Sequence, residues 1–188
     1  MRNTKKFFCL LILQTISITN TFSQRYSIRT NLFNLIAKGP SFAFGKYINE
    51  NKEILLTFSN GKFAPFLNED SYKYSTVHIE FRWENGYFLW GKPYIGTYMR
   101  YIHKRIITEG FTGGPYGLFS KEARNFIGDG ISIGMTSGAE WSIGKNWFVD
   151  LNNMMGVGKY IFQKDYAAHE KINIFLDARI ALQLGYKF

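Results

Sequence analysis

Three separate stretches of this chain alternate apolar and polar side chains residue by residue, and this pattern constrains the fold more than any other feature. The clearest stretch, 77–84, has the apolar set Val77, Ile79, Phe81 and Trp83 and the polar set His78, Glu80, Arg82 and Glu84. Because successive side chains of a β-strand point to opposite faces, a two-residue period predicts a strand with one apolar and one charged face.

The other two stretches carry the same pattern over a greater length. At the C-terminus the apolar face comprises Ile172, Ile174, Leu176, Ala178, Ile180, Leu182, Leu184, Tyr186 and Phe188, and the polar face comprises Asn173, Asp177, Arg179, Gln183 and Lys187. In 131–143 the apolar face is Ile131, Ile133, Met135, Ala139, Trp141 and Ile143. Alternating segments of about 9–11 residues or more are what a tilted strand needs to cross a membrane. In soluble proteins strands centre on about 5–6 residues.

Less regular alternation predicts five further strands, which brings the total to eight. We place them at 25–36, 41–49, 53–63, 93–107 and 147–163. Two polar residues, Lys46 and Asn153, fall on faces that are otherwise apolar, and we expect a β-bulge or a strand end near each of them.

An open sheet with an apolar outer face would leave unpaired backbone groups at its edges, which is prohibitive in lipid. We therefore expect an all-β fold, an eight-stranded antiparallel up-and-down transmembrane β-barrel. The connections fit such a barrel because short turns alternate with long loops. The short turns are 49–52, 144–146 and an aromatic turn at 85–92, and the opposite end carries 37–40, 62–73, the glycine-rich 107–129 and 166–171.

Residues 1–23 have the pattern of a cleavable signal peptide. Arg2, Lys5 and Lys6 precede the apolar run 7–13, which is too short to span a bilayer as a helix. We assign 1–23 to the signal peptide and 24–188 to the barrel; a short buried N-terminal helix is the alternative.

Removal of the signal peptide takes away Cys9, so the mature chain has no thiol or disulfide chemistry. The formal charge falls from +9 to +6, because three basic residues leave. This modest excess is weak support for nucleic-acid binding, and anionic lipid head groups explain it equally well.

The interior of an eight-stranded barrel is just wide enough to be filled by side chains. The candidate interior carboxylates are Glu80, Glu84, Glu140, Asp150 and Asp177, and the candidate interior cations are Arg29, Arg82, Arg100, Arg179 and Lys187. Buried charges are costly unless they are paired and hydrogen-bonded. We therefore predict a salt-bridge network that plugs the lumen.

The C-terminus carries the most specific signal. Phe188 is preceded at two-residue steps by Tyr186, Leu184, Leu182 and Ile180. This resembles the terminal-strand signature by which the barrel-assembly machinery recognises outer-membrane barrels.

More narrowly, the chain resembles an uncharacterised family of small outer-membrane barrels common in Bacteroidota, with OmpA/OmpX-like architecture. The resemblance covers most of the mature chain and rests on 30–33, 80–83 followed by Gly96, 138–141 and 156–158. Lys46 departs from the pattern, because an acidic residue is expected after Gly45. The resemblance implies the fold and a location in the outer membrane of a Gram-negative bacterium, and it implies no established activity.

The sequence predicts no catalytic, metal or cofactor site. The histidines, His78, His103 and His169, lack metal-ligand spacing, and we expect His78 to form hydrogen bonds in the lumen. The segment 113–117 lacks the Gly-Lys-Ser/Thr of a phosphate loop. We interpret the aromatics near strand ends as an interfacial girdle: Trp83, Tyr87, Phe88, Trp90, Trp141 and Trp147.

The favoured hypothesis is a non-enzymatic envelope protein whose loops, chiefly 108–129, present an interaction surface. The expected partners are outer-membrane lipids and lipopolysaccharide, the barrel-assembly machinery and a surface or envelope protein, without nucleic acid or cofactor. One alternative is an enzyme that modifies lipid or lipopolysaccharide, for which Ser137 and His103 are the candidates on the lipid face. The other is a secreted soluble barrel for a small apolar ligand, which requires apolar side chains inside and polar ones outside.

Overall fold

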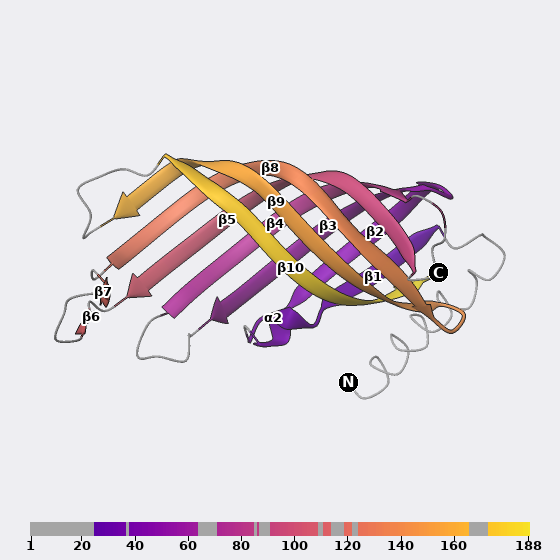
Figure 1. Cartoon of the computed structure of the whole chain (residues 1–188), viewed down its shortest axis with the longest axis horizontal. Coiled ribbons are helices and arrows are strands. Elements are labelled where there is room, and N and C mark those ends of the chain that lie inside the picture. Colours follow the sequence, from indigo (N-terminus) through magenta and orange to yellow (C-terminus); the bar gives the residue numbers. More distant parts are fainter. Residues whose placement is uncertain are drawn as a thin grey trace, which may run out of the picture.

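Eight antiparallel strands close into one barrel in the order β1-β10-β9-β8-β5-β4-β3-β2, so the predicted fold is confirmed (Figure 1). The structure is a computed structural model that describes residues 25–36, 38–63, 71–84, 86, 91–108, 111–113, 119–121, 124–165 and 173–188. Neighbouring strands follow one another along the chain, and the last pairs with the first, as in an up-and-down barrel.

The barrel strands differ widely in length. They are β1 (Tyr26–Asn31), β2 (Ser41–Asn49), β3 (Lys52–Phe63), β4 (Ser71–Glu84), β5 (Lys92–Thr108), β8 (Arg124–Ile143), β9 (Trp147–Asp165) and β10 (Ile174–Lys187). A helix, α2 (Phe33–Ile36), follows β1, and a small hairpin, β6 (Phe111–Gly113) with β7 (Phe119–Lys121), lies between β5 and β8. We call the end with the β2–β3, β4–β5 and β8–β9 turns the short-turn end, and the other end the loop end.

Apolar side chains face outward and charged ones face inward along every clear strand. Phe81 and Ile180 are 42% and 64% exposed, whereas Glu80 and Asp177, on the opposite faces of the same strands, are 0% and 3% exposed. A barrel that binds an apolar ligand in water requires the reverse arrangement. The orientation therefore contradicts the soluble-barrel alternative.

The chain ends close the barrel. The backbone of Tyr26 donates a hydrogen bond to the Phe188 carbonyl (3.1 Å) and accepts one from its N–H (3.0 Å), and the two rings stack with centroids 6.1 Å apart. The register continues from Ser27–Lys187 to Asn31–Gln183. The outward side chains of the predicted terminal signature, Ile180 to Phe188 at two-residue steps, thus belong to the strand that seals the barrel.

The first strand is shorter than predicted. β1 ends at Asn31, and Phe33–Ile36 form helix α2, so the prediction of a strand over 25–36 is wrong for its last residues. The Asn31 side-chain carbonyl accepts a hydrogen bond from the Phe33 N–H (3.1 Å), as at the start of a helix. Asn34 then donates to the carbonyls of Gly39 (2.9 Å) and Asn60 (2.7 Å). Side-chain capping of this kind leaves no trace in hydrophobic periodicity.

The strands around the longest loop extend further than predicted. β8 begins at Arg124, not at 131, so 107–129 is not one continuous loop, and β4 begins at Ser71, not at 77, which shortens the loop predicted at 62–73. Gly128, which was part of the predicted loop, and Gly130 face inward. A Cβ at these positions would approach the rings of Phe126 and Phe175 to 2.6 and 2.7 Å. These glycines give space to aromatic rings.

The two predicted irregularities have different outcomes. The register of β2 with β3 shifts between Tyr47 and Asn49, so the prediction near Lys46 is confirmed. Lys46 faces outward and does not reach the lumen. Asn153 lies in unbroken register opposite Ser137 and Ile180, so the irregularity expected there is wrong. The backbone ladder tolerates an outward polar side chain, because the side chain takes no part in it.

Several predictions fall outside the described residues. These are the signal peptide at 1–23, the aromatic turn at 87–90, the centre of the loop 62–73 and His169. Within the described residues, no helix is long and apolar enough to cross a membrane.

Candidate functional site: the charged barrel interior

Asp150 on β9 lies at the centre of the charges in the short-turn half of the lumen. Its Oδ2 accepts hydrogen bonds from Nη1 of Arg29 (2.8 Å) and of Arg82 (2.7 Å), and its Oδ1 accepts one from the Tyr94 hydroxyl (2.7 Å). These partners come from β1, β4 and β5. One fully buried carboxylate therefore ties together four strands across the lumen.

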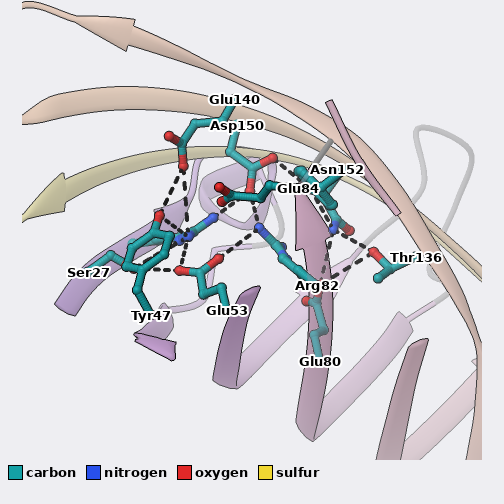
Figure 2. Close-up of polar contacts among 12 residues, drawn as sticks. Ser27, Tyr47, Glu53, Glu80, Arg82, Glu84, Thr136, Glu140, Asp150 and Asn152 are labelled. Carbon is teal, nitrogen blue, oxygen red and sulfur yellow. Dashed lines mark hydrogen bonds and ion pairs between the residues drawn. The ribbon is translucent and has the colours of Figure 1, made fainter. Parts of the chain in front are cut away.

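Two glutamates complete the neutralisation of these arginines. Glu53 on β3 pairs with Arg29 and accepts a hydrogen bond from the Ser27 hydroxyl (3.0 Å). Glu80 accepts from Arg82 Nε (2.9 Å) and from the Asn152 amide (3.2 Å). Figure 2 shows these carboxylates converging on the guanidinium groups from several strands.

Two further ion pairs, Glu140 with Lys187 and Glu84 with Lys92, lie nearer the short-turn end. We call the whole set the ionic belt; it consists of Arg29, Glu53, Glu80, Arg82, Glu84, Lys92, Glu140, Asp150 and Lys187. Five carboxylates thus face four cations. Isolated buried charges cost several kcal/mol each, and this cost is offset only where pairing and hydrogen bonding are nearly complete.

Aromatic rings fill the space between the charges. The Arg82 guanidinium carbon lies 4.4 Å from the Tyr94 ring centroid, and that of Arg29 lies 4.7 Å from the Phe148 centroid. Lys187 lies 5.0 Å from both the Tyr47 and the Phe148 rings. Cation–π contacts of this kind add attraction where water is excluded.

The loop half of the lumen is organised around Asp177. This carboxylate accepts hydrogen bonds from Arg100 Nε (2.9 Å) and from the Tyr98 hydroxyl (3.0 Å), and also from the Ser132 hydroxyl. Arg179 lies nearby, with Nη1 3.1 Å from the Nε2 atom of His78. His78 itself is 3.1 Å from Glu80, so this imidazole links the two halves.

The structure places all ten predicted interior charges inside the barrel, in two groups. Seven belong to the ionic belt: Arg29, Glu80, Arg82, Glu84, Glu140, Asp150 and Lys187. Arg100, Asp177 and Arg179 lie in the loop half. Sequence reasoning missed Glu53 and Lys92. Glu53 could have been found, because it precedes outward Ile54 and shares its face with Thr57.

The candidate residues on the outer face do not come together as a pair. Ser137 lies opposite Ile95, whereas His103 lies opposite Asp129, eight residues earlier on β8. At about 3.3 Å per residue the two side chains are about 26 Å apart, so Ser137 cannot be activated by His103. Within the described residues, no cluster of His, Cys, Asp and Glu could hold a metal ion.

Solved structures with the same fold include two small bacterial barrels. The crystal structure of Neisserial surface protein A matches with a TM-score of 0.56 at 13% identity, covering 88% of this chain and 98% of that one. The N-terminal β-barrel domain of Pseudomonas aeruginosa OprF matches with a TM-score of 0.50 at 11% identity and the same coverages. At such low identity these likenesses establish the fold alone.

No curated protein matches this chain. One family model matches residues 7–186, nearly the whole sequence, and its description agrees with the resemblance to an uncharacterised family. The chain belongs to the family described as "Protein of unknown function (DUF3575)".

Proposed function

We propose that this protein is a small barrel of the Gram-negative outer membrane, closed to diffusion by the ionic belt, that acts in the cell envelope through its extracellular loops. The observation that carries the proposal is the difference between the outer and inner faces of the barrel. Its apolar side chains face outward, and its charges are paired inside. In lipid this arrangement is stable, whereas in water it would expose an apolar surface of many strands.

Closure of the lumen is tested by conductance. The purified barrel inserted into a planar bilayer should show no stable ion current, because paired charges and aromatic rings fill its short-turn half. A steady conductance of the wild-type protein would refute closure. A variant in which Arg29 and Arg82 are both replaced by Ala serves as the positive control, because it removes the two side chains that cross the lumen.

The loop between β5 and β8 is the best candidate for the interaction surface. β5, β8 and β9 are the longest strands, at 17, 20 and 19 residues, and the β6–β7 hairpin lies between β5 and β8. Thr108 and Arg124 are register partners, so residues 109–123 can be replaced by an Asn-Gly turn without disturbing the barrel. The replacement should leave membrane insertion of the barrel intact and abolish its binding to a surface or envelope partner. Unchanged binding of that partner would refute the role of the loop.

A second candidate function, lipid hydrolysis, is favoured by one observation on the outer face. Ser75, His103 and Asp129 are register partners on β4, β5 and β8, and His103 Nδ1 lies 2.6 Å from an Asp129 oxygen. Across the three strands the imidazole thus lies between a hydroxyl and a carboxylate, which is the spatial arrangement of a serine hydrolase triad. Ser75 Oγ would attack an ester carbonyl and pass its proton through His103 Nε2 to the leaving alcohol; water would then release the acid and restore Ser75.

Lipid profiles with and without the protein test the second candidate. In a hydrolase, Ser75→Ala and His103→Ala would abolish release of fatty acid. The matched control, Ser137→Ala, removes an outward hydroxyl far from His103 and should leave release unchanged. Lipid profiles that are identical with and without the wild-type protein would eliminate this candidate.

A further inference from the structure

A cavity of about 390 Å³ lies in the loop half of the barrel, beyond the ionic belt. Its described lining includes three cations, Arg100, Lys104 and Arg179, and one carboxylate, Asp177. The ionic belt has the opposite balance, with more carboxylates than cations. The cavity is therefore the place in the described lumen where positive charge is in excess.

Arg179 is a cation of this cavity whose charge is poorly compensated by the described residues. Its Nη1 contacts the imidazole of His78, and its Nη2 is buried without a hydrogen-bond partner among the described residues. No carboxylate of the described residues lies within 4.0 Å of it, because Asp177 is engaged by Arg100, Tyr98 and Ser132. A guanidinium withdrawn from water without a counter-ion is costly, so an anion that reached Arg179 would be strongly stabilised.

The cavity also reaches the outer face of the barrel. On β10 it is lined by the inward residues Asp177 and Arg179 and by the outward residues Leu176, Ala178 and Ile180. Inward and outward residues of one strand can border the same cavity where the cavity reaches the edge of that strand. This edge leads from the charged interior to the apolar surface.

The edge of β10 has no strand partner at this level because β1 is short. The β1–β10 register stops at the pair Asn31–Gln183, so the stretch of β10 nearer the loop end extends past the last residue of β1. Helix α2 replaces the missing strand and lies beside β10 (Figure 1), and its Phe33 and Asn34 line the cavity. The wall thus has a lateral opening, bordered by β10 and α2.

We propose that this cavity binds a long-chain carboxylate, which enters from the apolar outer face through the lateral opening. The planar guanidinium of Arg179 suits a carboxylate head group through two parallel N–H···O bonds, and Arg100 and Lys104 add positive potential. The acyl chain lies along Leu176 and Ile180. A volume of about 390 Å³ is near the lower limit for ligand sites, which fits one chain better than a lipid with several. The proposal goes beyond a closed barrel with interacting loops, for which no ligand is needed.

Binding of a fluorescent carboxylate to the full chain in phosphatidylcholine nanodiscs tests the proposal. The probe is cis-parinaric acid, and its methyl ester is the matched neutral probe. The acid should bind saturably, one molecule per barrel, and the ester at least tenfold more weakly. Arg179→Gln should weaken binding of the acid about tenfold and leave the ester unaffected, whereas Arg179→Lys, which keeps the charge, should retain most of the affinity.

The control variant is Arg105→Gln, because Arg105 is exposed on the outer face of β5 and does not line the cavity. It should bind the acid as the wild type does. If Arg179→Gln fails to fold, Lys104→Gln replaces it, with weaker binding of the acid expected. Equal affinities for acid and ester, or equal losses in Arg105→Gln and Arg179→Gln, would overturn the proposal. Stronger displacement by dodecyl phosphate than by dodecanoate would also overturn it, in favour of a phosphate head group.

Discussion

The two halves of the barrel interior are built from the same alternating strands, yet they satisfy their charges differently. In the short-turn half, Arg29 contacts Glu53 and Asp150, and Arg82 contacts Glu80 and Asp150. In the loop half, Arg179 contacts only the imidazole of His78 among the described residues. In the first half the charges pair with one another, whereas the second half contains a cavity with cations in its lining.

The difference comes from which strands contribute acids, and the fold does not impose it. β3, β4, β8 and β9 each place a carboxylate in the ionic belt, whereas Asp177 on β10 is the acid in the lining of the cavity. A balance of charge summed over the whole lumen therefore hides a local excess. The proposed closure and the proposed ligand binding can coexist in one small barrel because pairing is local.

The largest effect is expected from Asp150→Asn. This change leaves two buried guanidinium groups with one counter-ion fewer, and removal of one partner from a buried ion pair costs about 3–5 kcal/mol. Urea unfolding of the barrel in lipid vesicles should therefore show a large fall in the free energy of unfolding.

The matched control for that prediction is Asp129→Asn, because Asp129 is a carboxylate on the outer face whose partner His103 is exposed. An exposed ion pair contributes about 1 kcal/mol or less. Equal losses in the two variants would mean that the ionic belt is hydrated, and the contrast between the two halves would disappear.

The strands and the inward set of charges could be predicted from the sequence because both follow from one period. Once Ile79 and Phe81 are outward, Glu80 and Arg82 must be inward, whatever their partners are. Partners depend on register and strand tilt, which no local pattern encodes. The pairing of Arg29 with Asp150, 121 residues away, could therefore not be predicted from the sequence.

Helix α2 and the lateral opening could not be predicted from the sequence either, for a different reason. Both depend on where β1 ends, and that is decided by the hydrogen bonds of Asn31 and Asn34 with nearby backbone. Leu32 lies on the same face as Tyr26 and Ile28 in a two-residue period, so the sequence predicted more strand. One turn of helix in place of a strand leaves β10 without a strand partner on this side at the cavity.

The next largest effect is expected from Gly185→Ala, which we compare with Gly158→Ala. Both glycines face phenylalanine rings across β9 and β10. Gly185 lies opposite Phe148, and Gly158 lies opposite Phe175. A Cβ at either position would collide with the ring. Phe148 is 1% exposed and held by Arg29 and Lys187, whereas Phe175 borders the cavity and can move into it. Gly185→Ala should cost about 1–3 kcal/mol and Gly158→Ala clearly less, as measured by urea unfolding. Equal costs would mean that the cavity gives the Phe175 ring no freedom.

A smaller effect is expected from Asn34→Ala, which acts in the loop half alone. The Asn34 amide donates to the carbonyls of Gly39, Pro40 and Asn60, and its oxygen accepts from the Tyr74 hydroxyl. Loss of these four bonds should cost about 1–2 kcal/mol net and speed hydrogen exchange at Lys38 and Gly39. Exchange in the ionic belt should not change. Tyr74→Phe, which removes a single bond, should have the weaker effect; the reverse order would mean that α2 is held by Tyr74.

The smallest effect on stability is expected from Arg179→Gln. Because no carboxylate of the described residues contacts Arg179, replacing this cation removes an uncompensated charge and breaks no ion pair. The free energy of unfolding should change by about 1 kcal/mol or less, or rise slightly. Arg82→Gln, the matched change in the ionic belt, leaves Glu80 and Asp150 without a shared cation and should cost several times more. A loss in Arg179→Gln as large as in Arg82→Gln would require an anion already bound to Arg179 within the chain. The cavity would then be a second closed network, with no charge left for a ligand.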